Sequence, residues 1–263
     1  MRFICTDAYK GYCQSYISYH TKTLVVNASG TPNVYFATNF HIEEFARDVL
    51  PTIKIPSVFI SGGCDWDITL HRKGVATILE SPMITRWLAN NVQMIHPKLI
   101  SVPVGIGFDH ERSGAHPILA ETMEANLPKK ALVYASYTLG TNTPARKKCF
   151  EETDILYPWT GFRENLEAIA RSLFVISPCG GGVDCYRHWE ALYLKTIPIV
   201  TDDNLNIRFY RDLPFVLIKD WSEFKTLKLG WDLYHKVWNN FDVNRLDFDN
   251  YLKEALTKKN PLL

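Results

Sequence analysis

Three consecutive glycines follow an apolar run at residues 173–176 that predicts a buried strand: Gly180, Gly181 and Gly182. Glycines let backbone N–H groups come close to a phosphate, and the N-terminus of a following helix adds a favourable dipole. Ser177 opens this loop, and Asp184 stands where an N-cap is expected for a helix beginning near Cys185. The pattern predicts an anion-binding loop between a strand and a helix.

The helix expected after the glycines carries two charged side chains, Arg187 and Glu190. Their spacing places them near one another on one helix face. Arg187 could offer a bidentate cationic fork to a phosphate, and Glu190 could accept hydrogen bonds from a ribose diol. The alternative is a tight glycine turn next to a surface ion pair between the two residues.

Two carboxylates, Asp65 and Asp67, follow a predicted strand at residues 57–60. Ligand crevices in open α/β sheets form at the carboxyl ends of strands, so either residue could act as a general base. The alternative is that an aspartate caps a turn or the next helix. Asp109 and His110, in a loop at residues 105–110, favour a turn role when each is taken alone.

A further helix is expected to start at residues 141–144, with Arg146, Lys147 and Lys148 in its first turns. Cations near a helix N-terminus oppose the helix dipole. This conflict indicates a task for Arg146, such as contacting a diphosphate, whereas the alternative is a solvated basic face.

Composition is that of an ordinary soluble globular protein, with 46% hydrophobic residues, 22% charged residues and a net charge of +1. A charge this small disfavours nucleic acid as a partner. The six cysteines form no CxxC pair, which argues against a zinc ribbon and favours reduced thiols. The start of the chain resembles a strand more than a signal peptide, and no apolar run approaches the roughly 18 residues of a membrane span. We therefore expect a soluble, cytoplasmic protein.

Strands and helices alternate in two series along the chain. Further strands are predicted at residues 2–6, 24–26, 92–95, 99–104, 131–135, 197–200 and 215–218, and helices at residues 41–50, 81–90, 162–172 and from 220 onward. A polar stretch at residues 111–130 separates the series. The expected fold is α/β, with two Rossmann-like lobes facing each other across a cleft. The lobes are expected at residues 1–125 and 126–245, followed by a C-terminal helix at residues 246–263 that packs back on the first lobe.

Several motifs together resemble the exostosin-like glycosyltransferases, which have the GT-B fold. The second-lobe signature comprises Ser177-Pro178, the three glycines, Asp184, Arg187, Trp189-Glu190-Ala191-Leu192 and Ile197-Pro198-Ile199-Val200. Softer matches are Ser61-Gly62-Gly63-Cys64-Asp65, Trp87-Leu88-Ala89-Asn90-Asn91, His96-Pro97-Lys98, Val102-Pro103-Val104-Gly105, Tyr134 to Ser136, Thr141-Asn142 with Arg146, and Asp220-Trp221-Ser222-Glu223. The resemblance spans residues 57–225. Lys195, where the family often has glycine, and Cys179, where a charged residue or Asn is often mixed with the glycines, depart from the pattern.

The resemblance implies a nucleotide-sugar-dependent enzyme that inverts the anomeric carbon. Arg187 would bind the donor diphosphate, Glu190 the ribose hydroxyls, and Arg146 with Asn142 would complete the donor site. Asp65 is the first choice for the base, Asp67 the second, with His41 and Asp109 in reserve. The short chain is also similar to compact glycosyltransferases of large algal DNA viruses, some of which add xylose to glycans.

The partners implied are a UDP-sugar, with UDP-xylose as the best guess, and a glycan or oligosaccharide acceptor. No metal or other cofactor is expected, since GT-B enzymes commonly stabilise the leaving diphosphate with helix dipoles and basic side chains. A nucleotide-dependent oxidoreductase is disfavoured because the glycines lack the GxGxxG spacing. A non-catalytic carbohydrate- or nucleotide-binding module remains the alternative.

Overall fold

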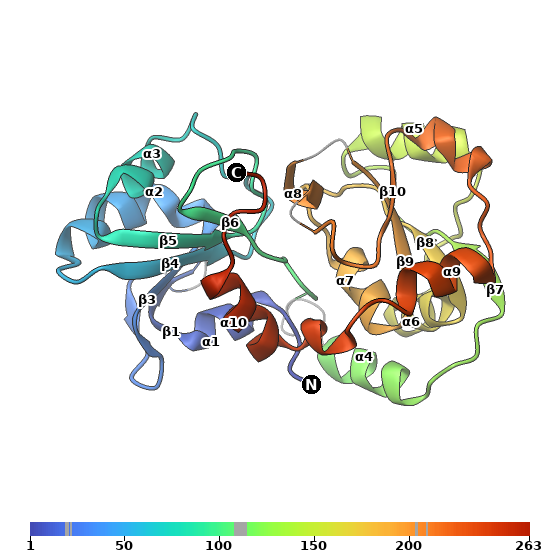
Figure 1. Ribbon diagram of the computed structural model, residues 1–263, viewed down its shortest axis with the longest axis horizontal. Coiled ribbons are helices and arrows are strands. Elements are labelled where there is room, and N and C mark those ends of the chain that lie inside the picture. Colours follow the sequence, from blue (N-terminus) through green and yellow to red (C-terminus); the bar gives the residue numbers. More distant parts are fainter. Residues whose placement is uncertain (19–20, 22, 108–114, 203–204, 209) are drawn as a thin grey trace. The chain divides into compact units, whose positions relative to one another are not determined.

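The computed structural model describes residues 1–18, 21, 23–107, 115–202, 205–208 and 210–263. The chain forms two compact units (Figure 1). The first contains Met1–Val104 together with Asp247–Leu263, and the second contains Gly105–Leu246. Each is a mixed α/β structure built on a sheet that is mostly or wholly parallel.

The first unit contains a six-stranded sheet with the order β2-β1-β3-β4-β5-β6. Only the β1–β2 pair is antiparallel, and the other neighbours run parallel. The strands are β1 (Cys13–Ile17), β2 (Val25–Val26), β3 (Thr31–Thr38), β4 (Ser57–Gly62), β5 (Ile84–Ala89) and β6 (Leu99–Ser101). The ring of Phe59 stacks on Phe45 with centroids 4.0 Å apart and lies 5.2 Å from Trp87. These buried aromatic rings join the sheet to the helical segment that crosses it.

Short helices complete the first unit. They are α1 (Thr6–Tyr12), η1 (Asn39–His41), α2 (Ile42–Glu44), η2 (Phe45–Val49), η3 (Leu50–Thr52), α3 (Lys73–Glu80) and α10 (Phe248–Thr257). In Figure 1, α10 lies beside α1, although the two are at opposite ends of the chain. The Phe248 ring meets the Tyr9 ring at 5.1 Å, and the Arg2 guanidinium lies 4.4 Å from the Phe248 centroid. Aromatic packing therefore fixes the C-terminal segment to the first unit.

The second unit contains a four-stranded, fully parallel sheet with the order β10-β9-β8-β7. Its strands are β7 (Ala131–Tyr134), β8 (Ser172–Ile176), β9 (Ile197–Thr201) and β10 (Val216–Ile218). The two central strands, β8 and β9, are buried at every residue, as parallel strands covered on both faces should be. The helices are α4 (Ala115–Glu124), α5 (Thr143–Thr153), α6 (Phe162–Ala170), α7 (Tyr186–Tyr193), α8 (Leu205–Arg208), η4 (Trp221–Thr226), α9 (Trp231–Trp238) and η5 (Val243–Leu246).

Three predictions about the first unit are wrong. Residues 81–90 form no helix, because Ile84–Ala89 is strand β5, which pairs with β4 and β6, and its Trp87 indole N–H donates to Ser61 Oγ at 2.9 Å. Residues 92–95 form no strand and contribute only an isolated bridge from Val92 to Ile68. Residues 2–6 form no strand either, since α1 begins at Thr6. For β5, pairing with β4 and β6 decided the outcome, and local periodicity does not report such pairing.

The boundary between the units differs from the expected position near residue 125. Val104 ends the first unit, and the segment from Gly105 belongs to the second. Within it, α4 is tied to α6 by an ion pair of 2.7 Å between Glu121 and Arg163. The polar composition of this stretch indicates an exposed helix of the second unit.

Replacing Phe248 with alanine tests how the C-terminal segment is held. The side chain is fully buried, so F248A should lower the free energy of unfolding of the first unit by about 3–5 kcal/mol. Urea unfolding measured by Trp fluorescence reports the change. Leu263 is 74% exposed, and L263A in the same segment should stay within about 0.5 kcal/mol of the wild type. Equal effects of the two substitutions would contradict the packing of α10.

Candidate functional site

Two arginines meet at one tyrosine in the second unit. The guanidinium carbons of Arg146, from α5, and Arg187, from α7, lie 5.9 and 5.6 Å from the centroid of the Tyr137 ring. Tyr137 follows β7 at the carboxyl end of the sheet, where ligands of parallel α/β sheets usually bind. Burial and the neighbouring Arg187 both lower the pKa of Arg146. The two guanidinium groups therefore repel each other beside the Tyr137 ring.

Backbone carbonyls hold both guanidinium groups in place. Arg146 donates from Nε to Cys179 O at 2.9 Å and from Nη1 to Thr138 O at 2.8 Å. Arg187 Nη1 makes longer contacts, 3.4 Å to Ser177 Oγ and 3.5 Å to Pro178 O. In the part of the chain that the structure describes, no carboxylate forms an ion pair with either arginine. Their charges are left for an anion to neutralise.

The glycine loop borders Arg146 closely. A Cβ atom on Gly180 would lie 3.2 Å from Arg146 Nη2, so a larger residue there would push against the guanidinium. The Gly180 N–H donates to Gly182 O at 3.1 Å, so this amide forms a hydrogen bond within the loop. Gly181 is exposed, whereas Gly180 and Gly182 are buried. The loop thus shapes the arginine site, while the backbone amide of Gly180 is already used.

A pocket of about 770 Å³ opens at this site, a size that suits a nucleotide-sized ligand. Its lining comprises Ser136, Tyr137, Thr138, Thr141, Arg146, Leu156, Tyr157, Pro158, Trp159 and Arg187. Tyr157 stacks on Tyr134 with centroids 5.4 Å apart and is 50% exposed, and Trp159 is 62% exposed. The pocket combines a cationic wall with exposed aromatic faces. The pocket positions of Tyr137, Tyr157 and Trp159 were not predicted, because Tyr and Trp have no spacing rule that marks a pocket wall.

Asp184 does not cap α7, contrary to the sequence-based expectation. The N-cap is Cys185, which makes no side-chain capping bond. Asp184 is buried and accepts hydrogen bonds from Trp189 Nε1 at 2.9 Å and from the Tyr210 hydroxyl at 3.4 Å. Asp184 is therefore an internal anchor for α7 and not an exposed donor ligand.

His188 joins the same buried network and was not predicted. Its Nδ1 lies 3.3 Å from Asp184 Oδ1, and its Nε2 lies 3.2 Å from the Ser177 carbonyl oxygen. Both partners are acceptors, so the ring is best satisfied when both nitrogens are protonated. Burial alone lowers the pKa of His188, but Cys185 and Asp184 raise it above the ordinary value. The resulting imidazolium connects β8 to the first turn of α7.

The other expected donor residues lie in different environments. Glu190 is buried on α7. Asn142 is exposed with a left-handed φ of 46°, and its neighbour Thr141 lines the pocket instead. Ser177 is buried and contacts Arg187. Of the expected donor ligands, Arg146, Arg187, Ser177 and Gly180 are thus brought together.

In the first unit, Asp65 and Asp67 are exposed in the loop that follows β4. Partial desolvation, followed by the charge of Asp65, raises the pKa of Asp67. A raised pKa makes a carboxylate a stronger base, so this loop has the electrostatics of a base-bearing segment.

Buried asparagines hold the aspartate loop at the carboxyl ends of β3 and β5. Asn39 Nδ2 donates to Trp66 O at 2.8 Å and to Asn90 Oδ1 at 2.9 Å. Asn91 Nδ2 donates to Cys64 O at 2.9 Å and has a left-handed φ of 53°. These amides satisfy loop carbonyls that a flexible loop would leave to water. The role of Asn39 was not predicted.

The remaining candidates predicted from the sequence are His41, Asp109 and His110. His41 is buried, and its Nδ1 lies 2.7 Å from Thr38 Oγ1. Asp109 and His110 lie outside the described residues. All six cysteines are free. Within the described ranges, no group of three or more His, Cys, Asp or Glu residues could hold a metal ion.

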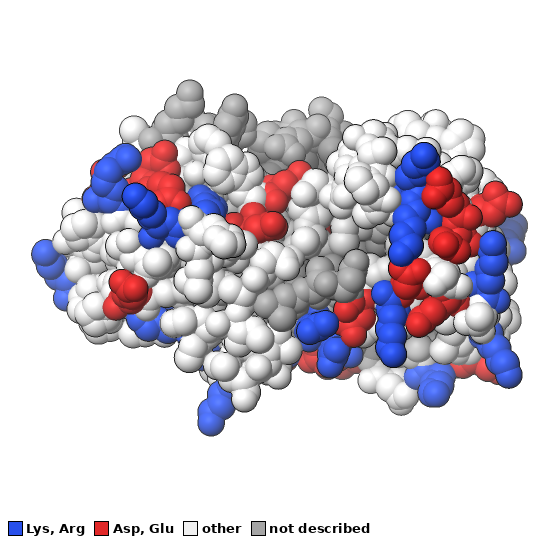
Figure 2. Space-filling view, turned by 90° about the horizontal axis from the view of Figure 1, so that it is seen from above, with Lys and Arg blue, Asp and Glu red and all other residues white. Residues whose placement is uncertain are grey.

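Comparison with known proteins gives no assignment: neither the models of protein families nor the curated proteins contain a match to this chain. The described helices include none that is long and apolar enough to cross a membrane. On the face drawn in Figure 2, basic and acidic side chains are interspersed, in keeping with a net charge of +1.

Removing the buried anchor should destabilise the second unit. D184A leaves the Trp189 indole, the Tyr210 hydroxyl and the His188 ring without their acceptor, so the free energy of unfolding should fall by about 3 kcal/mol. Urea denaturation measures the loss. Asp232 is exposed in the first turn of α9, and D232A should change stability by less than about 0.5 kcal/mol. A neutral D184A would show that the network is not stabilising.

Replacing Asp65 with asparagine should lower the pKa of Asp67. The substitution removes a negative neighbour and so favours the ionised form of Asp67. Carboxyl ¹³C NMR titration of wild type, D65N and the control D48N measures the shift, since Asp48 is an exposed aspartate of the same unit that does not affect the pKa of Asp67. An unchanged Asp67 titration in D65N would contradict the coupling.

Proposed function

We propose that the protein is an inverting glycosyltransferase of the GT-B type that uses a nucleotide-sugar donor. The observation that carries the proposal is the pair of arginines at Tyr137, which face a large pocket without a described carboxylate partner. A nucleoside diphosphate supplies the missing negative charge. The mixed α/β units with parallel sheets are compatible with such an enzyme.

The donor diphosphate would bind between Arg146 and Arg187. Each guanidinium can present two parallel N–H groups to a phosphate, a geometry that an ammonium lacks. The same two charges would stabilise the leaving nucleoside diphosphate as the glycosidic bond breaks. Arg146 is the more rigid of the two, because its backbone contacts are shorter than those of Arg187. Arg187 is therefore the residue free to close on the ligand.

The nucleoside would lie along the aromatic part of the pocket. Tyr157 is half-exposed, and its ring stacks on Tyr134. Bases stack well on such rings. Glu190 remains the proposed ligand of the ribose hydroxyls. The proposed donor is UDP-xylose, and the proposed acceptor is a hydroxyl of a glycan.

Transfer also requires a base for the acceptor hydroxyl. Asp65, or Asp67 as the second choice, would take the proton of the acceptor hydroxyl while its oxygen attacks the anomeric carbon. The carbon–oxygen bond to the diphosphate breaks on the opposite face, and the nucleoside diphosphate leaves with the electron pair. The raised pKa of Asp67 supports a base in this loop. We further propose that this chemistry proceeds without a metal ion, and adding EDTA to the transfer assay tests that part.

Arginine substitutions test the donor site. R187A should weaken UDP binding about 10- to 100-fold in calorimetry, which corresponds to the loss of one or two charge-assisted hydrogen bonds. K147A is the matched control, because Lys147 is an exposed cation on α5 that pairs with Glu151 at 3.7 Å. Unchanged UDP affinity of R187A would refute the donor site.

Aspartate substitutions separate transfer from binding. D65N, D67N and the double variant should bind UDP like the wild type, and the variant lacking the true base should lose transfer of sugar from the donor. Full transfer by the double variant would exclude both aspartates. A wild type that binds donor but never cleaves it, with or without acceptor oligosaccharides, would instead identify a non-catalytic binding module.

A further inference from the structure

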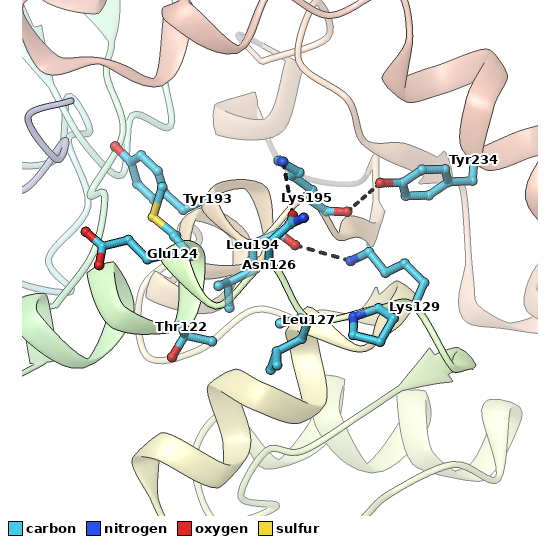
Figure 3. A pocket seen from close by; sticks show the side chains of 12 residues that line it. Thr122, Glu124, Asn126, Leu127, Lys129, Tyr193, Leu194, Lys195 and Tyr234 are labelled. Carbon is cyan, nitrogen blue, oxygen red and sulfur yellow. Dashed lines mark hydrogen bonds between the residues drawn. The ribbon is translucent and has the colours of Figure 1, made fainter.

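A second pocket, of about 510 Å³, lies at the opposite end of the same sheet (Figure 3). Its walls come from the segment before β7, the end of α7 and the turn into β9, whereas the arginine site lies beyond the carboxyl ends of β7 and β8. Its lining comprises Thr122, Met123, Glu124, Asn126, Leu127, Pro128, Lys129, Ala170, Tyr193, Leu194, Lys195 and Tyr234. The proposed donor site uses none of these residues.

Two lysines approach this pocket from different segments. Lys129 Nζ donates to Thr196 Oγ1 at 2.7 Å and to Leu194 O at 3.2 Å. Lys195 Nζ lies 3.5 Å from Asn126 Oδ1, a long and weak contact. Figure 3 shows both lysine side chains on the side of the pocket where Tyr234 lies, with Glu124 on the other side. The lysine side of the pocket is therefore cationic.

The described part of the chain provides no carboxylate for these lysines, although the Lys129 ammonium lies 6.0 Å from the centroid of the Tyr234 ring. Neither forms an ion pair with a carboxylate of the described residues. Burial and the nearby Lys195 lower the pKa of Lys129 to about 7. The charge of Lys195 thus disfavours the charged form of Lys129, and an anion that contacts both ammonium groups would offset this effect.

Lys195 directly follows the C-cap of α7 in a left-handed conformation. Its φ is 54°, and the Tyr234 hydroxyl donates to its carbonyl oxygen at 2.8 Å. The Thr196 N–H donates to Ala191 O at 2.8 Å, so this conformation ends the helix and fixes the backbone of Lys195 at the pocket. Glycine would adopt this conformation without strain but would lack the ammonium group.

We propose that this pocket binds a small organic anion with a single acid group, which lies between Lys129 and Lys195, and an aromatic or apolar body against the pocket wall. The wall offers apolar surface from Leu127, Leu194, Met123 and Tyr193. Glu124 on the other side disfavours a second acid group at the far end of the ligand. The acid group is a carboxylate or a phosphate monoester, and the experiment separates these two.

The proposal predicts that binding is linked to a proton. Below pH 7 Lys129 is already protonated, so the anion binds without proton uptake. Above pH 7 Lys129 is largely neutral, and an anion that stabilises its charged form must take up a proton on binding. The affinity for the anion should therefore fall about tenfold for each pH unit above 7. The fall ends at the pH where Lys129 is neutral in both the free and the anion-bound protein.

Calorimetry with benzoate and phenyl phosphate tests this site in the full chain, with benzyl alcohol as the neutral analogue. Titrations at pH 6.5 and 8.5, each in two buffers of different ionisation enthalpy, report proton uptake directly. K129M and K195M each remove one cation, and K225M removes an exposed lysine of η4 that does not line the pocket. A UDP titration of each variant shows whether the arginine site remains intact.

The expected result is binding of at least one anion, weaker at pH 8.5, with close to one proton taken up at that pH. K129M and K195M should each weaken it about tenfold or more, and K225M should leave it unchanged. Preference for benzoate identifies a carboxylate ligand, and preference for phenyl phosphate identifies a phosphate monoester. Equal affinity for benzyl alcohol, or no binding of either anion, would overturn the proposal. So would binding to wild type without proton uptake at pH 8.5, a result that does not depend on the folding of any variant.

Discussion

Two guanidinium groups held against one tyrosine ring, without a described carboxylate to balance them, are the constraint on which the second unit depends. Like charges at this spacing repel, and partial burial increases the repulsion because water screens it less. The backbone carbonyls of residues 138 and 179 accept hydrogen bonds from Arg146 and so stabilise the arrangement. These carbonyl contacts therefore hold Arg146 at the proposed anion site.

A second buried network sets the position of Arg187. Asp184 accepts hydrogen bonds from the Trp189 indole and the Tyr210 hydroxyl. His188 links Asp184 to the Ser177 carbonyl. These contacts tie the first turn of α7 to the end of β8, the strand that precedes the glycine loop. The glycines alone would leave that loop loose. The buried acid and imidazole give the loop a defined shape and hold the partly exposed Arg187, in the first turn of α7, next to the pocket.

Parts of this arrangement could be predicted from the sequence because they depend on local rules. The strand at residues 173–176, the glycine loop, the helix after Cys185 and the strand at residues 197–201 all follow from apolar runs and glycine placement. Arg146 was singled out because a cation in the first turns opposes the dipole, and it does line the pocket. The strand at Ile84–Ala89 was mistaken for a helix because its stability comes from β4 and β6, which are distant in sequence. Asp184 was mistaken for a cap because only the tertiary structure shows three donors converging on its carboxylate.

The central claim is that the second unit recognises a diphosphate through its paired arginines. Calorimetric titration of the wild-type protein with UDP, UMP and uridine tests this claim most directly, since the three ligands differ only in phosphate number. The account predicts that affinity falls in that order, with uridine at least about tenfold weaker than UDP and with UDP binding weakened by added salt. Equal affinities for UDP and uridine, or no binding of UDP, would contradict it.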